Sequence, residues 1–241
     1  GNAMKGFCYA AALQFRLDIR SKALLITCYL VPLLFFGLMG GIFTSLDPNA
    51  KTTLLPSMTV MGVSMGALIG LPPTLTELYG TQVKKMYQAG GVPLCMGTVT
   101  TALSAFVHLM ILGGILYLAA PLAFDAALPK HPIPYFASLA LLIAVTLSLG
   151  CVLGLAVKNQ SKLTMICQLF FLPSILLSGI LVPVELLPSP LSQLGMLFPA
   201  YWGYQLMQED GFGWGNLWPL LIILLAAISV CGVLLRRIRR R

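Results

Sequence analysis

The chain has 241 residues, of which 58% are hydrophobic and only 9% are charged, and its formal net charge at pH 7 is +8. So few charged side chains argue against a soluble domain and against a nucleic-acid partner, which needs clustered Lys and Arg on an exposed face. Six cysteines are present, but no two have CxxC spacing, so neither a disulfide framework nor a zinc site is expected.

Six apolar stretches each have the length that a helix needs to cross a bilayer, about 20 residues for a hydrocarbon core of about 30 Å. We therefore expect an all-α, polytopic membrane protein with six transmembrane helices. The expected spans are residues 23–43, 54–73, 94–120, 134–157, 163–183 and 217–235. Residues 1–3, before Met4, look like an expression scar, which leaves residues 4–241 as a single transmembrane domain.

The fifteen Lys and Arg residues are unevenly distributed among the connecting segments. Thirteen lie before the first span, after the second, after the fourth or at the C-terminus, and only Lys51 and Lys130 lie elsewhere. Because cytoplasmic segments are rich in Lys and Arg, both termini of this multi-pass protein are expected in the cytoplasm. The C-terminal run RRIRRR, residues 236–241, is expected to contact anionic lipid headgroups.

Residues 7–22, which precede the first span, mix apolar and charged side chains. Apolar residues recur at helical spacing: Phe7, Ala11, Phe15 and Ile19. The charged residues are Arg16, Asp18, Arg20 and Lys22. This pattern favours a helix lying in the cytoplasmic interface of the membrane over a simple extension of the first span.

Small residues recur every four positions in three of the expected spans. They are Gly62, Gly66 and Gly70; Gly150 and Gly154; and Ser174 and Ser178. Small residues let helix backbones approach closely in lipid, and for the glycines we favour packing within the chain over a dimer interface. Pro72 and Pro73 are expected to bend or end the second helix near the cytoplasm.

The segment 74–93 is the longest expected cytoplasmic loop. Thr74 or Thr76 is expected to cap a short helix within it, and two glycines and Pro93 are expected to stop further helix. A charged and aromatic helix between two spans is a candidate docking element for a partner.

Residues 184–216 are expected outside the cell, yet they are too apolar for a free loop, and prolines break them into short pieces. Irregular backbone survives at membrane depth only where protein covers it or where it lines a cavity. We therefore expect a pair of short re-entrant helices in the outer leaflet, between spans five and six. Aromatic residues are expected at the headgroup level; these are Tyr201, Trp202, Tyr204, Trp214 and Trp218.

Two polar residues, His108 in the third expected span and Gln168 in the fifth, lie at membrane depth. Such a histidine is either part of a proton relay or a neutral side chain hydrogen-bonded to a neighbouring helix; we favour the second because no Asp or Glu lies at mid-depth. The same lack argues against ion-coupled transport. No phosphate-binding loop or hydrolase motif is present, so we do not expect the chain itself to be an enzyme or to hold a metal or cofactor.

Three features together resemble the type-2 permease family of ATP-binding cassette (ABC) exporters. The first is the charged helix expected at 7–22. The second is the run ELYGT at 77–81 with the later Pro93, similar to the family's Glu-x-x-Gly-Thr element. The third is SGILVP at 178–183, followed by Leu-Pro and Phe-Pro pairs, which looks like the end of the family's fifth helix and its external re-entrant helices.

The resemblance implies a half-transporter. Two permease subunits, identical or different, would form the pathway, and two separate ATPase subunits, which hold ATP and Mg²⁺, would dock from the cytoplasm. The ATPase-docking loop would comprise Glu77, Tyr79, Gly80, Thr81, Lys84 and Lys85. The interfacial helix would transmit motion through Arg16, Asp18, Arg20 and Lys22. The dimer seam or substrate pathway would include Leu30, Leu34, Leu38, His108, Gln168, Leu172, Ile175 and Gly179.

The expected function is export of a hydrophobic or amphipathic compound, such as a drug, an antibiotic peptide or a lipid, because the expected external loops are too short for a capture domain. Two alternatives stay open. One is a membrane immunity or sensor subunit that transports nothing, and the other is an ion-coupled secondary carrier. An ATPase partner distinguishes export from the first alternative, and resistance to a protonophore distinguishes it from the second.

Overall fold

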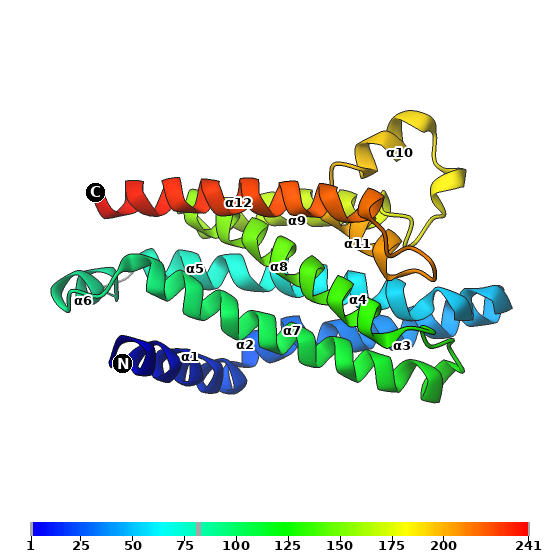
Figure 1. Ribbon diagram of the computed structural model, residues 1–241, viewed down its shortest axis with the longest axis horizontal. Coiled ribbons are helices and arrows are strands. Elements are labelled where there is room, and N and C mark those ends of the chain that lie inside the picture. The colour runs from blue at the N-terminus through cyan, green and yellow to red at the C-terminus, as the bar shows by residue number, and fades with distance from the viewer. Residues whose placement is uncertain (1, 81–82, 241) are drawn as a thin grey trace.

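The computed structural model describes residues 2–80 and 83–240, and all regular secondary structure in these ranges is helical (Figure 1). Within them, five helices are long and apolar enough to cross a membrane: Lys22–Leu46, Leu54–Gly80, Leu94–Phe124, Pro132–Ala156 and Trp214–Arg240. The first consists of α2 (Lys22–Leu25), a π-helical turn (Ile26–Leu30) and α3 (Val31–Leu46). The second consists of α4 (Leu54–Met65), a π-helical turn (Gly66–Gly70) and α5 (Leu71–Gly80). The other three are α7, α8 and α12.

The fifth expected span, residues 163–183, is occupied by the shorter helix α9 (Gln160–Leu176), which has 17 residues. Asn159 caps the start of this helix, because its side chain accepts a hydrogen bond from the backbone N–H of Lys162. It ends early because Gly179 adopts a left-handed backbone conformation with φ +89°, which glycine tolerates and which terminates a helix. A helix of 17 residues is at the lower limit for crossing a bilayer. The other five expected spans have the required length, and the span expected at 163–183 stays a prediction.

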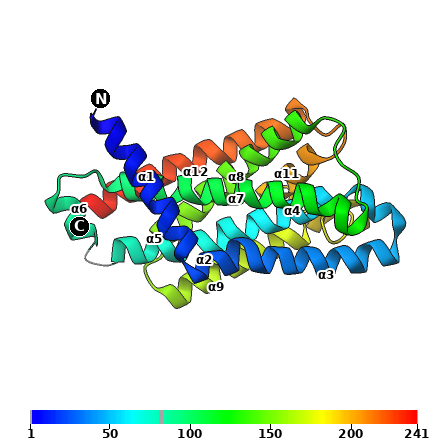
Figure 2. The same ribbon diagram turned by 90° about the horizontal axis from the view of Figure 1, so that it is seen from below.

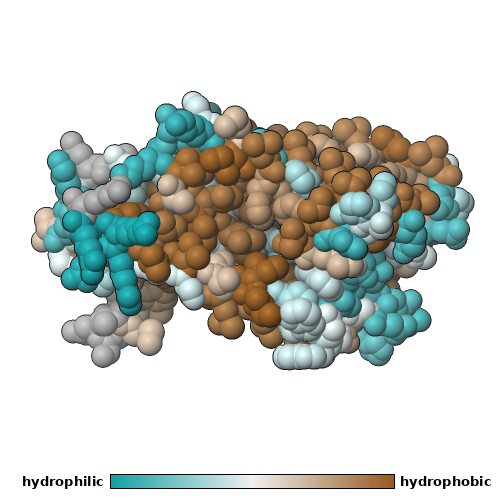
Figure 3. Space-filling view, turned by 90° about the horizontal axis from the view of Figure 1, so that it is seen from above, coloured by the Kyte–Doolittle hydropathy of each residue, from teal (hydrophilic) through white to brown (hydrophobic). Residues whose placement is uncertain are grey.

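The long helices run side by side, and both termini lie at the same end of the bundle (Figure 1 and Figure 2). We call this the terminal end; it also carries α6 (Val83–Ala89), whereas the connections after α3, α7 and α9 lie at the opposite, loop end. Figure 3 shows hydrophobic surface between more hydrophilic surfaces at the two ends, the pattern of a bundle embedded in a membrane. That the terminal end faces the cytoplasm stays a prediction from charge.

The second span is the centre of the bundle. In its most apolar part 89% of the residues are buried, against 22% for the first span and 17% for α12. The glycines make this possible: a Cβ on Gly62 would lie 3.1 Å from Leu112 of α7 and 3.2 Å from Pro32 of α3, and a Cβ on Gly154 would lie 2.8 Å from the Pro72 carbonyl oxygen. The expectation that the glycines pack within the chain is therefore confirmed.

The prolines do not end the second helix, which continues to Gly80. A proline cannot donate to the carbonyl four residues before it and pushes that carbonyl aside. For Pro72 and Pro73 these carbonyls belong to Leu68 and Ile69, which lie in the π-helical turn Gly66–Gly70, where the regular bonding pattern is already displaced. The expected loop at 74–93 is consequently shorter, and Thr76 lies inside a helix rather than capping one.

Helix α1 (Asn2–Arg20) is separate from the first span. Ser21 breaks the helix with an extended backbone (φ −77°, ψ 114°), and its hydroxyl caps α2 by accepting from the Leu24 backbone at 3.4 Å. Figure 2 shows α1 running obliquely to the long helices. The simple extension of the first span is thus wrong, and a distinct N-terminal helix is confirmed.

The two short helices expected near the loop end are α10 (Ser189–Gly195) and α11 (Pro199–Met207). Helix α11 packs into the bundle against α4, α8 and α12, whereas α10 projects from it (Figure 1). Tyr204 of α11 is buried in the hydrophobic core, so its expected place among headgroup-level aromatics is wrong: it fills the space beside Gly179. Trp214 and Trp218 are exposed, as expected.

The two basic residues expected on the external side both have carboxylate partners. Lys51 Nζ lies 3.5 Å from Asp125, and Lys130 Nζ lies 2.8 Å from Glu209. The hydrogen bond from Lys130 to Glu209 raises the pKa of Lys130. These exposed pairs neutralise the positive charge of the loop end but contribute little to stability.

Candidate functional site

The expected ATPase-docking residues lie at the terminal end of the bundle. Glu77 and Gly80 occupy the last turn of α5 and are exposed, and Lys85 is exposed on α6. Thr81 lies outside the described residues, and Lys84 is described only as a residue of α6. We call residues 77–89 the docking element, with residues 81–82 not described. It combines exposed charges with a helix end that leads directly into the buried second span.

Two side chains fix the base of the docking element to the bundle. The Tyr79 hydroxyl donates to the Leu94 carbonyl, is hydrogen-bonded to Thr98 Oγ1 at 2.6 Å, and accepts from the Thr98 backbone N–H at 3.1 Å. Thr76 Oγ1 lies 3.0 Å from the Gly154 carbonyl oxygen, to which it donates. Tyr79 therefore joins α5 to α7, and Thr76 joins α5 to α8. The sequence assigned Tyr79 to the docking loop, but its hydroxyl is directed into the protein.

A cluster of polar side chains joins α1 to the membrane-spanning helices. Asp18 is only 6% exposed; its Oδ2 accepts from the Ser104 hydroxyl of α7, and its Oδ1 accepts from Gln14 at 2.9 Å. Ser104 lies ten residues into α7, about 15 Å from its start. Asp18 thus differs from the charged residues near it in sequence, because Arg16 and Arg20 of α1 and Lys22 at the start of α2 are exposed.

His108 lies one helical turn beyond Ser104 and completes this polar cluster. Its Nδ1 lies 2.7 Å from the hydroxyl of Tyr29, which belongs to the π-helical turn of the first span. Its ring stacks on Phe15 of α1, with ring centres 4.5 Å apart. Among the described residues, His108 Nε2 has no hydrogen-bond partner. This geometry is that of a histidine packed between three helices and bonded to a neighbour, as the favoured interpretation expects.

We define the polar cluster as Gln14, Asp18, Tyr29, Ser104 and His108. It could not be found from the sequence because its members lie as many as 94 residues apart and no local pattern signals their contact. A carboxylate therefore does lie beside a membrane-spanning helix, contributed by α1. The absence of an acidic residue at mid-depth of the spans is therefore a weaker argument against ion coupling than it is in the sequence alone.

The expected dimer-seam residues separate into two groups. Leu30, Leu34 and Leu38 form an exposed stripe on the first span, and Leu172 is exposed on α9. In contrast His108 and Ile175 are 1% and 3% exposed, Gly179 is buried, and Gln168 is half-buried. The exposed face of α9 carries residues that the sequence analysis did not select, although their helical spacing is visible in the sequence: Met165, Leu169 and Leu176.

Comparison with protein families finds that the model described as ABC-2 family transporter protein matches residues 45–236. No curated protein matches the chain. The matched range contains the docking element, α7 with Ser104 and His108, and α9, but it leaves out α1 and nearly all of the first span, so the α1 side of the polar cluster lies outside it.

Proposed function

Because the chain belongs to the ABC-2 transporter family, we propose that it is one of two permease subunits of an exporter for a hydrophobic or amphipathic compound. Family membership makes the chain a membrane-embedded permease subunit of an ABC transporter that associates with ABC ATPases. The proposal adds the outward direction, the class of compound (a drug, an antibiotic peptide or a lipid), a second permease copy, and residence in a prokaryotic inner membrane. Two partner ATPases would supply ATP and Mg²⁺.

The observation that carries the proposal is the anchored docking element. Glu77 and Lys85 are exposed where a partner can reach them, while Tyr79 and Thr76 bond the same helix end to α7 and α8. A force applied at Glu77 would therefore act on three spans at once. Helix α1 offers a second route, because Asp18 ties it to α7, and His108 of α7 is in turn hydrogen-bonded to the first span.

The exposed apolar stripes support a second permease copy. The first span is the least buried span after α12, and its stripe at Leu30, Leu34 and Leu38 is exposed. On α9, Leu169 and Leu172 are exposed in the same way. Exposed leucines are stable in lipid without a protein partner. The second copy is therefore supported by the family and by the periodic spacing of the stripes, which suits close helix packing.

Glu77→Lys is expected to separate the permease from its ATPase. A reversed charge at the first residue of the docking element should lower recovery of the co-expressed complex about tenfold, equivalent to about 1.4 kcal/mol of binding free energy. The measurement is co-elution of the chain with the ATPase encoded nearest to it, together with ATPase activity. Glu185→Lys, the same change on an exposed residue at the loop end, is the control and should have no effect.

Two results would contradict this assignment. Equal complex recovery for Glu77→Lys and Glu185→Lys would mean that the docking element is elsewhere. A chain that purifies as a defined oligomer and binds no ATPase offered would remove ATP-driven export and favour the immunity or sensor alternative.

His108→Asn is expected to preserve transport. The asparagine amide can take over the hydrogen bond between His108 Nδ1 and the Tyr29 hydroxyl in either direction, since it has both a donor and an acceptor, whereas asparagine cannot carry a proton. ATP-driven uptake of a panel of fluorescent amphipathic dyes into inverted membrane vesicles should therefore survive both this substitution and a protonophore. Loss of uptake under both conditions would favour the ion-coupled carrier, for which the closeness of Asp18 to His108 is the supporting observation.

A further inference from the structure

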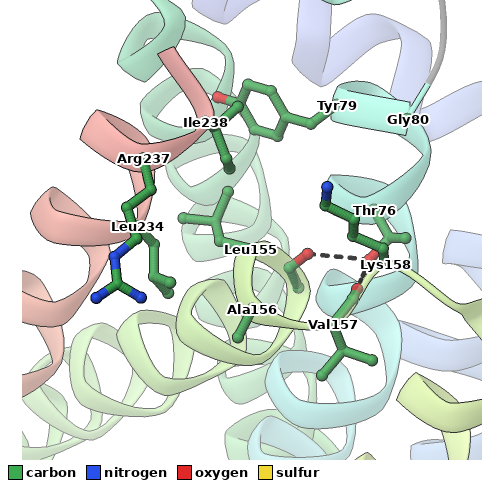
Figure 4. Close-up of a pocket in the computed structure, with 11 residues that line it drawn as sticks. Thr76, Tyr79, Gly80, Leu155, Ala156, Val157, Lys158, Leu234, Arg237 and Ile238 are labelled. Carbon is green, nitrogen blue, oxygen red and sulfur yellow. Dashed lines mark hydrogen bonds between the residues drawn. The ribbon is translucent and has the colours of Figure 1, made fainter. Parts of the chain in front are cut away.

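A cavity of about 540 Å³ opens at the terminal end of the bundle, between the ends of α5, α8 and α12 (Figure 4). Thr76 and Tyr79 line it from α5, Leu155 from α8, and Ile238 from α12. Lys158, just beyond α8, and Arg237 of α12 belong to different walls, as Figure 4 shows. We call this the cationic cavity.

Among the described residues, no ion pair balances the charge of the cationic cavity. Its lining includes Lys158 and Arg237 but no carboxylate. The two ion pairs found among the described residues are both at the loop end, so neither cation is neutralised by one. Arg236 and Arg240 line a smaller hollow next to Arg237, which increases the positive potential at this end of α12. An anion is therefore the ligand that the cavity favours.

A second cavity, of about 460 Å³, lies between α7, α8 and α12. Its lining is almost entirely apolar and includes Phe106 of α7, Leu147 of α8, and Ile228 and Leu235 of α12. It exists because α12 packs closely on α8 but scarcely touches α7. We call it the apolar groove; in a membrane-spanning bundle it is exposed to hydrocarbon rather than to water.

The cationic cavity and the apolar groove adjoin each other. On α8 the lining passes from Cys151 in the groove to Leu155 in the cavity, which is one helical turn. On α12 it passes from Leu235 to Ile238. Thr98 lines the groove and is hydrogen-bonded to Tyr79, which lines the cavity. A single elongated ligand can thus contact both, with its charged part at the end of the spans and its apolar part at membrane depth.

From this juxtaposition we propose a binding site for one anionic phospholipid of the leaflet at the terminal end. The phosphate lies between Lys158 and Arg237, and an acyl chain lies in the groove between α7, α8 and α12. A soluble phosphate compound would satisfy the cations but leave the groove unused, and a neutral lipid would do the reverse. The proposal depends on residence in a membrane and not on the direction of transport or on the compound transported.

The bound lipid would connect α12 to the docking element. Helix α12 packs on α8 and α11 but contributes little else to the bundle, whereas Thr76 and Tyr79 of the cavity wall are the residues that anchor α5 to α8 and α7. A lipid held between these walls bridges a peripheral helix and the base of the docking element. Its occupancy is therefore expected to influence the response to the ATPase.

The test measures lipid retention by native mass spectrometry of the full-length chain, purified in detergent and supplied with dioleoyl phosphatidylglycerol or dioleoyl phosphatidylcholine. The unmodified chain should retain one phosphatidylglycerol, with at least tenfold preference over phosphatidylcholine. Glycerol phosphate, which carries a phosphate group of at least the same negative charge but no acyl chains, should not bind measurably. The double variant Lys158→Gln with Arg237→Gln should lose most of the preference.

Two matched controls make the result specific. Lys162→Gln with Arg239→Gln removes the same charge from exposed residues outside the cavity lining and should keep the preference. Gly232→Phe places a ring in the groove at a position with no neighbouring atom within 4 Å, and should weaken retention without changing charge. Gly37→Phe, equally open on the first span, should not.

Three outcomes would overturn the proposal. If the two double charge variants lost the preference for phosphatidylglycerol equally, the attraction would be a diffuse electrostatic one without a site. Tight binding of glycerol phosphate would mean a soluble anion as the ligand. Full retention in Gly232→Phe would mean that no acyl chain occupies the groove. Size-exclusion profiles identical to the unmodified chain establish for each variant that the fold is intact.

Discussion

Gly150→Leu is expected to prevent assembly of the bundle. The Gly150 backbone of α8 lies directly against the second span: a Cβ on Gly150 would overlap the Ala67 carbonyl oxygen and lie 3.3 Å from its carbon. Backbone atoms cannot move aside as a flexible side chain can. Adding even a methyl group to such a contact costs about 1–3 kcal/mol, and a leucine should push α8 away from the helix that forms the centre of the molecule.

The measurement is the fraction of detergent-extracted protein that elutes as a single symmetric peak, with its thermal midpoint. Gly114→Leu is the control, because α7 leaves open space around Gly114, with nothing within 4 Å of its Cβ position. We expect Gly150→Leu to lose nearly all monodisperse protein and Gly114→Leu to retain it. An equal monodisperse fraction for both variants would show that α8 and the second span can move apart to accept a leucine side chain.

The second large effect is expected for Asp18→Ala. The substitution removes the acceptor for Ser104 and Gln14 and leaves a polar hydroxyl buried on α7. Hydrogen bonds to a charged group contribute about 1.5–3 kcal/mol, which corresponds to a change of about 10- to 150-fold in the ratio of docked to undocked α1. The coupling of ATPase activity to transport through α1 should fall accordingly, while the bundle itself stays folded.

Two measurements on the permease–ATPase complex test this expectation. Hydrogen exchange of α1 should become faster in Asp18→Ala, and the dye-stimulated part of the ATPase activity should fall, while Asp18→Asn, which can still accept from Ser104, should be milder. Arg16→Ala, on the exposed face of the same helix, is the control. Fast exchange with unchanged stimulated activity would show that α1 is docked by Asp18 but is not a coupling route.

The sequence predicted the long helices well, because span length and hydropathy are local properties. It did not predict that the second helix passes through Pro72 and Pro73, since this depends on a π-helical turn at Gly66–Gly70 for which no residue pattern is diagnostic. Nor did it predict that Gly179 adopts the left-handed conformation that terminates α9. The assignment of Gly179 to the dimer seam or substrate pathway stays a prediction.

The candidate site was only partly predictable for a different reason. Glu77 and Lys85 could be selected from a local motif, and the structure places both on the surface at one end of the bundle. The sequence could not show that Asp18, unlike its charged neighbours, is buried, because the hydroxyl that donates to it belongs to Ser104, 86 residues away. The exposed side of α9 could not be predicted, since a helix that is apolar on all sides gives no signal of which side faces the bundle.

The burial of the second span has a mechanical consequence. Its apolar part is 89% buried, and it contacts the first span, α7, α8, α9 and α11. A helix enclosed on so many sides cannot slide or tilt alone without opening voids along its whole length. When its tip at the terminal end is pushed, the subunit is expected to tip as one block. With the proposed second copy, any opening for a transported compound would then form along the boundary between two such blocks and not through the interior of either.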